Sequence, residues 1–177
     1  MIIQLLAQNP LAKKAGVFFL AGCLSLPGLA SRTIAQADLS GEWKLNEQKS
    51  ELGQFGANLA PKSLKVQSVA DAVSIERTAL TRNGEERTTK ERLTFDGKEA
   101  ETAIYGNSKK KSTAKWSPDG QVLTVNSTIL FDRNGETMEI KVTETWKLAE
   151  GGLLSVESTS TSSWGTNTMK LVYDKVK

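Results

Sequence analysis

The chain contains no histidine and only one cysteine, Cys23, which lies in an apolar N-terminal stretch. Histidine is the side chain most often used for proton transfer near neutral pH, and it is the commonest ligand of transition metals. Catalysis by a Ser-His or Cys-His pair is therefore excluded, as are zinc sites built from histidine or cysteine. We expect no metal and no cofactor. The rest of the chain cannot form a disulfide bond, so its stability must come from burial.

The chain also carries little net charge. The formal charge of +3 is accounted for by Lys13, Lys14 and Arg32, which all lie within the first 37 residues. The other 20 cations balance the 20 carboxylates, so the remainder of the chain is neutral. A neutral domain has no long-range field that would attract phosphate backbones, and we therefore expect no nucleic-acid partner.

The N-terminal stretch has the organisation of a secretory signal peptide. Two lysines precede an apolar run over residues 15–30, and the small-residue pattern Ala35-Gln36-Ala37 follows. This order predicts a signal peptide over residues 1–37, cleavage after Ala37, and an exported protein that is periplasmic or extracellular. The apolar run is shorter than the roughly 20 residues of a membrane-spanning helix, so we expect no membrane span in the mature chain.

A second processing signal lies inside the same stretch. Leu20-Ala21-Gly22-Cys23 resembles the lipobox of bacterial lipoproteins, in which the cysteine is lipidated and becomes the new N-terminus. Lipoprotein tethers are normally polar, whereas residues 24–30 continue the apolar segment. We therefore favour cleavage after Ala37, with Cys23 as the alternative lipidation site and a lipid anchor only if that cysteine is processed.

Residues 38–177 predict one all-β domain. Apolar and polar residues alternate, as in Leu123, Val125, Ile129 and Phe131, which is typical of half-buried strands. Turn sequences such as Asn134-Gly135 separate the runs. The expected strands cover residues 38–46, 63–69, 72–80, 87–95, 99–105, 109–116, 121–131, 136–148, 153–160 and 166–176.

The turn spacing leaves no room for crossover helices, so consecutive strands must pair antiparallel. An open sheet of this size would leave two edges free to pair with other molecules, and closure removes them. The sequence therefore predicts an antiparallel up-and-down meander closed into a barrel of eight to ten strands, with a sandwich as the alternative.

Three segments carry a resemblance to a known family. Gly41-Glu42-Trp43 on the first strand resembles the G-x-W motif of the lipocalin and calycin group, and residues 38–46, 106–111 and 171–175 look like small secreted lipocalin-like proteins of bacteria. The resemblance implies a barrel closed at one end by the motif. Lipocalins also stack a late arginine on this tryptophan; here the last strand offers Lys170 in the polar register, and Arg77 is the alternative.

Some polar residues share the apolar registers that define the interior. Our hypothesis is that Arg77, Glu91 and Glu144 line the polar end of a ligand cavity, because isolated buried charges are costly and are usually paired or hydrated. The cavity walls would include four aromatic residues, Trp43, Trp116, Trp146 and Tyr173. The alternatives are a structural ion-pair cluster, a register shifted by a bulge, and aromatic residues that only build the core.

These observations favour a non-enzymatic barrel that binds a small apolar or amphipathic ligand in its interior. The alternative is an envelope or surface module, structural or protein-binding, with a filled barrel. An enzyme comes last, because Glu91 and Glu144 on separated strands are weak support for a glycoside-hydrolysing acid–base pair. The run Lys109-Lys110-Lys111 is interpreted as a solvated hairpin edge.

Overall fold

The structure is a computed structural model that describes residues 35–53, 60–81, 83–105, 108–133 and 136–176. The alternative lipidation site, Cys23, lies outside these residues, as does most of the expected signal peptide. The division of the chain after Ala37 therefore stays a prediction. The described strands all belong to one compact unit, Thr33–Lys177.

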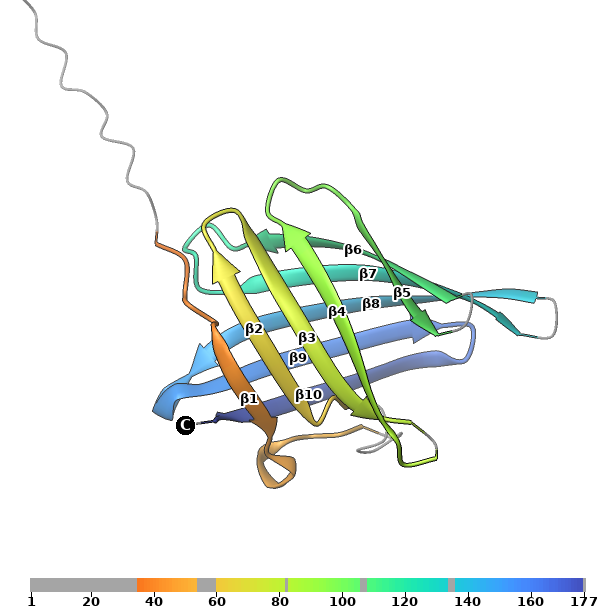
Figure 1. Ribbon diagram of the computed structural model, residues 1–177, viewed down its shortest axis with the longest axis horizontal. Helices are drawn as coiled ribbons and strands as arrows, with labels where there is room; N and C mark the ends of the chain where they lie inside the picture. Colours follow the sequence, from red (N-terminus) through yellow and green to blue (C-terminus); the bar gives the residue numbers. More distant parts are fainter. Residues whose placement is uncertain (1–34, 54–59, 82, 106–107, 134–135, 177) are drawn as a thin grey trace, which may run out of the picture. The chain divides into compact units, whose positions relative to one another are not determined.

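This unit is all-β. Two short 3-10 helices, η1 (Glu47–Lys49) and η3 (Glu150–Gly152), accompany the strands. The ten strands, shown in Figure 1, are β1 (Gly41–Leu45), β2 (Ser63–Val69), β3 (Ala72–Leu80), β4 (Glu86–Thr94), β5 (Ala100–Tyr105), β6 (Ser108–Trp116), β7 (Leu123–Arg133), β8 (Glu136–Ala149), β9 (Leu153–Ser162) and β10 (Gly165–Lys175). The predicted antiparallel meander is confirmed.

The sheet curls into a nearly closed barrel. Its order is β4-β3-β2-β1-β10-β9-β8-β7-β6-β5, so the first and last strands pair with each other. The two ends of the sheet are β4 and β5, which are neighbours in sequence but do not pair. The expectation that all consecutive strands pair is therefore wrong at this one seam. Figure 1 shows β1 to β4 running across β6 to β10, with the seam beside β5.

One end of the barrel, which we call the packed end, is filled by apolar side chains. Leu39 and Trp43 are fully buried, and the Trp43 indole N–H donates to the Leu39 carbonyl oxygen at 3.1 Å. The core continues through Leu123, Trp146 and Leu154. Each such side chain contributes about 1.5–3 kcal/mol on burial, so this end supplies much of the stability.

The cation beside Trp43 differs from both expectations. Lys175 on β10 lies directly opposite Trp43 on β1, and its Nζ is 5.3 Å from the Trp43 ring centroid. Lys170 instead lies near Glu51, and Arg77 lies over a different tryptophan. Lys175 continues the inward register of Met169, Leu171 and Tyr173, so following strand alternation to the end of the last strand would have found it.

A loop after β1 lies along the edge of β10. Glu51 and Lys170 exchange two backbone hydrogen bonds of 2.7 and 2.9 Å. Gly53 follows with φ of +66°, and a Cβ built on it would lie 2.7 Å from Oδ1 of Asn167. Glycine is therefore needed here both for its backbone conformation and for close approach.

Candidate functional site

Arg77 is the centre of a charged cluster inside the barrel. It lies on β3, two residues beyond Ile75, so strand alternation turns its side chain toward the interior. Its guanidinium donates to Glu91 on β4 and, at 2.7 Å, to Glu144 on β8. The Arg77 side chain is 12% exposed and that of Glu91 is 3% exposed, so these ion pairs are shielded from solvent.

Lys110 on β6 completes the cluster. Its ammonium donates to both oxygens of Glu91, at 3.0 and 3.1 Å, and its side chain is 14% exposed. The Ser112 hydroxyl reaches Glu91 at 3.3 Å and Ser127 at 2.9 Å. The expectation of a solvated lysine run is therefore wrong for Lys110, although counting inward residues back by twos from Trp116 would have found it.

These contacts also join the two sides of the seam. Glu91 belongs to β4, whereas Lys110 and Ser112 belong to β6, on the other side of the break in the sheet. Nearer the packed end, Phe95 and Trp116 meet edge to face with ring centroids 5.9 Å apart. Side chains thus link the barrel where backbone pairing stops.

Trp146 contacts two members of the cluster and so constrains their orientation. Its indole N–H donates to Glu144 Oε2 at 3.3 Å, and the Arg77 guanidinium carbon lies 5.3 Å from the ring centroid. A cation over an indole face is attracted by the negative charge density of the ring. The same tryptophan therefore contacts both partners of the Arg77–Glu144 pair.

Burial and charge shift the ionisation of the cluster. Burial raises the pKa of Glu144, but the charges of Arg77 and Lys110 oppose this and leave it below its ordinary 4.5. Burial and the neighbouring Arg77 lower the pKa of Lys110 from 10.5 to about 8. Near neutral pH, Glu144 is therefore ionised and Lys110 is predominantly protonated.

Tyr173 is another buried ionisable group, and burial is the main cause of its shifted pKa. Its hydroxyl donates to the Pro61 carbonyl oxygen at 3.2 Å, and burial, with a further contribution from Glu144, raises its pKa above 10.0. A tyrosine held in its neutral form here is a hydrogen-bond donor within the core.

The sequence hypothesis placed seven residues at one site, and the structure divides them. Arg77, Glu91, Glu144 and Trp146 meet in the cluster. Trp43 and Tyr173 lie in the apolar core with side chains about 1% exposed, and Trp116 packs against that core while half-buried. The ligand-binding role of these residues stays a prediction.

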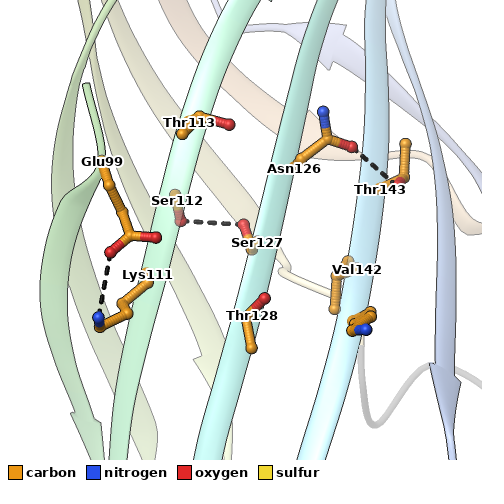
Figure 2. A pocket seen from close by; sticks show the side chains of 10 residues that line it. Glu99, Lys111, Ser112, Thr113, Asn126, Ser127, Thr128, Val142 and Thr143 are labelled. Carbon is orange, nitrogen blue, oxygen red and sulfur yellow. Dashed lines mark hydrogen bonds and ion pairs between the residues drawn. The ribbon is translucent and has the colours of Figure 1, made fainter. Parts of the chain in front are cut away.

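Three hollows lie among the described residues. The first, of about 250 Å³, is lined by outward residues of β6, β7 and β8, among them Lys111, Asn126 and Thr143, and also by Ser112, Ser127 and Val142 of the inward register. Figure 2 shows the ion pair of Glu99 with Lys111 and the hydrogen bond of Asn126 with Thr143 at this hollow.

The second hollow crosses β2, β3 and β4, and the third lies beside β1 and β10; their volumes are about 560 and 550 Å³. None of the three hollows is lined by Trp43, Trp116, Trp146 or Tyr173.

Farther along β7 and β8 from Glu144, toward what we call the far end of the barrel, the inward face becomes apolar again, beginning level with Lys110, which pairs with Ile129. On β7 and β8 the register pairs Ile129 with Ile140 and Phe131 with Met138. These four side chains continue the inward face that begins at Leu123, yet each is half-buried instead of buried. An apolar inward surface at this end is therefore incompletely covered.

Small residues, most of them polar, lie between the packed end and this surface. They form a row in which neighbours are paired in register across five strands: Asn167, Ser160, Val142, Ser127 and Ser112. Of these, Asn167, Ser112 and Ser127 are buried. Serine side chains occupy little volume, so this level of the barrel is not filled by bulky groups.

Metal sites and membrane-spanning helices are two further classes of feature to consider in the described part of the chain. No group of three or more histidine, cysteine, aspartate or glutamate side chains there is placed to hold a metal ion. Among the same residues, no helix has the length and apolar character needed to cross a membrane.

Comparison with known proteins gives one likeness of structure. The chain is similar to zebrafish ileal bile acid-binding protein, whose crystal structure is of its complex with cholic acid. The two are 18% identical, the alignment covers 77% of this chain and 98% of that chain, and the TM-score is 0.46. The sequence matches no protein-family model and no curated protein.

Proposed function

We propose that this protein is a non-enzymatic binding protein that takes a small amphipathic molecule into the far end of its barrel. The polar group of the ligand meets the cluster of Arg77, Lys110, Glu91 and Glu144. Its apolar part lies along the inward faces of β7 and β8, beside Ile129 and Ile140. The mature chain, starting at Asp38, is exported to the periplasm or the extracellular space.

The observation that carries the proposal is the order of surfaces inside the barrel. A packed apolar core is followed by shielded charges, and half-buried apolar side chains lie level with Lys110 and beyond it. A barrel built only for stability gains little from buried ion pairs, because desolvation offsets most of their attraction. Apolar side chains that remain partly exposed beside these ion pairs support an amphipathic ligand, because its apolar part would bury them.

The ionisation of the cluster supports binding over catalysis. A glycoside-hydrolysing pair needs one carboxyl with a raised pKa that can donate a proton. Glu144 instead has a lowered pKa, and Glu91 is tied to Arg77, Lys110 and Ser112. Carboxylates held this way position other groups and do not transfer protons readily.

Export is supported by where the folded part begins. Leu39 is the first fully buried residue of the described chain, and β1 starts at Gly41. Cleavage after Ala37 would therefore leave the whole sheet intact. The intact mass of protein recovered from the envelope or medium of its own cells tests this: a chain beginning at Asp38 is expected, and lipidated Cys23 at the N-terminus would contradict it.

Saturable binding of a neutral apolar dye tests the ligand site. We expect Nile red to bind with enhanced fluorescence and a fixed stoichiometry near one. Val142→Trp would fill the inward face between the cluster and the far end, so dye binding should fall about tenfold or more. The matched control is Thr143→Trp, which places the same side chain on the outer face of β8 and should leave binding unchanged.

The filled-barrel alternative predicts the opposite result. It expects no saturable binding in the wild-type protein, or equal binding in both tryptophan variants. Thermal unfolding of each variant confirms that it is folded, and Val142→Phe serves as a smaller blocking change if Val142→Trp does not fold. Equal binding by a folded Val142 variant and by Thr143→Trp would overturn the proposed site.

A further inference from the structure

We infer that Trp164, in the turn between β9 and β10, lies over the far end of the barrel and contacts the apolar part of the bound ligand. This inference rests on the proposed function and adds a residue to the same site. The sequence hypothesis named the other three tryptophans of the chain as cavity walls and left this one out.

Strand alternation directs Trp164 toward the interior. Val156 and Ser158 on β9 are buried on the inward face, and the same two-residue step leads through Ser160 and Ser162 to Trp164. The strand ends at Ser162, so the tryptophan is the next member of this inward series and lies in the turn.

The contact between Trp164 and Phe131 agrees with this direction. Their ring centroids are 6.1 Å apart, and the ring planes are inclined at 44°. Phe131 is an inward residue of β7, and β8 separates β7 from β9 in the sheet. Figure 1 shows the ends of β7 and β9 at the same end of the barrel. The indole therefore reaches past β8 on the inward side of the sheet.

Local sequence holds the turn that carries this indole. The hydroxyl of Ser162 accepts a hydrogen bond of 3.2 Å from the backbone N–H of Trp164. Ser162 and Gly165 are paired across the turn, and Gly165 has φ of +116°, which other residues rarely adopt. Serine before the tryptophan and glycine after it thus fix where the indole is presented.

Trp164 leaves the next layer of the apolar surface uncovered. Ile129 and Ile140 pair with each other one inward step closer to the packed end, and both are half-buried. Trp164 itself is 58% exposed, whereas Trp43 and Trp146 are about 1% exposed. An apolar group placed between the indole and the two isoleucines would bury all three, so the indole is positioned as the outer wall of the site.

Acrylamide quenching of fluorescence tests whether the ligand covers Trp164. Acrylamide is neutral and reaches the exposed indole of Trp164, while the core shields Trp43 and Trp146. We expect saturating dodecanoate to reduce the quenching of the wild-type protein about twofold, because the indole becomes buried. The same addition to Trp164→Phe should change quenching little; Trp116 is present in both proteins, so the difference isolates Trp164.

Affinity variants test what the contact contributes. Trp164→Ala should weaken dodecanoate, measured by displacement of Nile red, about fivefold or more, and Trp164→Phe should weaken it less because an aromatic ring remains. The matched control is Leu148→Ala, which removes an exposed apolar side chain of β8 at the packed end and should leave binding unchanged. Thermal unfolding confirms that each variant is folded, and Trp164→Phe serves if Trp164→Ala does not fold.

The outcomes separate this inference from the proposed function. If neither dye nor dodecanoate binds the wild-type protein, the proposed function fails. If both bind, but the quenching of Trp164 and the affinity of Trp164→Ala are unchanged, the binding function stands and the role of Trp164 is overturned. Equal loss of affinity in Trp164→Ala and Leu148→Ala would also overturn it, because the effect would not be specific to the far end.

Discussion

At the scale of single residues, Arg77 determines whether the buried carboxylates are tolerated. It contacts Glu91 and Glu144, whose strands β4 and β8 are distant both in sequence and in the sheet. A buried ion pair adds little net stability over an apolar replacement, but removing one partner leaves an uncompensated charge. The cluster is therefore sensitive to the loss of any single member.

Replacement of Arg77 by methionine tests this sensitivity. We expect Arg77→Met to lower the free energy of unfolding by about 3–5 kcal/mol, because two carboxylates lose their shared cation in a shielded environment. Urea denaturation measures the change. The control is Lys65→Met, which breaks an exposed pair with Glu42 and should have little effect; equal effects of the two variants would contradict the account.

Burial of Lys110 predicts that the free energy of unfolding rises with pH in the alkaline range. Its pKa is about 8 in the folded protein and about 10.5 when exposed, so the unfolded chain binds more protons between these values. Stability contributed by this group therefore rises with pH over that window. Below about pH 8 the full cost of the buried ammonium is present in the folded state.

The difference between wild type and Lys110→Met isolates this effect, because other groups titrate in both proteins. We expect the unfolding free energy of the wild type, relative to the variant, to rise by about 2–3 kcal/mol from pH 8 to pH 10.5. Denaturation at a series of pH values measures it. A difference that is flat or falls with pH would show that Lys110 is not buried as a cation.

Glu144 predicts a second pH effect at the acid side. Its folded pKa lies below 4.5, so its ionised form stabilises the protein at neutral pH and this stability is lost as the pH falls through the folded pKa. Glu144→Gln should therefore flatten the acid limb of the stability curve. Thermal unfolding between about pH 6 and pH 2 checks the prediction, and an unchanged acid limb would contradict it.

For single residues, the sequence predicted which side chains face the barrel interior wherever strand alternation is regular. Alternation grouped Arg77 with Ile75 and Glu144 with Trp146, and the structure places all four side chains on the inward face. Lys110 was hidden because its two neighbours are also lysines and a charged run suggests solvent. What sequence alone could not give was the pairing of individual charges, which depends on how strands meet across the barrel.

At the scale of elements, the loop after β1 depends on Gly53. A Cβ at this position would lie 2.7 Å from Asn167 Oδ1 and 2.8 Å from the Thr168 carbonyl oxygen. We expect Gly53→Ala to cost about 1–3 kcal/mol, because positive φ and a backbone clash act together. Gly84→Ala is the control, since Gly84 also has positive φ but open space around it and should cost less.

The seam between β4 and β5 predicts uneven protection of the backbone. Each of these strands has one neighbour, whereas residues 141–146 of β8 pair with both β7 and β9. Amides on the free edges should exchange with solvent faster than those of β8. Hydrogen exchange followed by mass spectrometry measures this, and equal protection of residues 86–94 and 141–146 would mean that the seam is closed in solution.

The strands were largely predictable and the seam was not. Ten expected runs match ten strands within a few residues, because alternation and turns such as Asp119-Gly120 are local signals. Closure is a property of the whole sheet: β1 pairs with β10, which brings the first and last strands together and leaves the break inside the meander. No local pattern in residues 95–99 indicates that pairing stops there.

At the scale of the whole molecule, the barrel has two ends of different character. The packed end buries Leu39, Trp43 and Trp146, while the far end leaves Phe131 and Ile140 half-buried beyond the charged cluster. The sequence indicated a barrel with polar residues inside, and it placed four aromatic residues around a cavity. The structure places Trp43, Trp146 and Tyr173 in the apolar core and Trp116 against it, and their role in ligand binding stays a prediction.

Chemical-shift mapping tests the central claim of a ligand site at the far end most directly. The backbone amides of the 15N-labelled protein are followed by NMR while dodecanoate is added. The account predicts saturable shifts at Ser127, Ile129 and Val142, with little change at Leu123 in the packed end. Shifts confined to outer-face residues such as Asn126 and Thr143, or no shifts at any concentration, would contradict it.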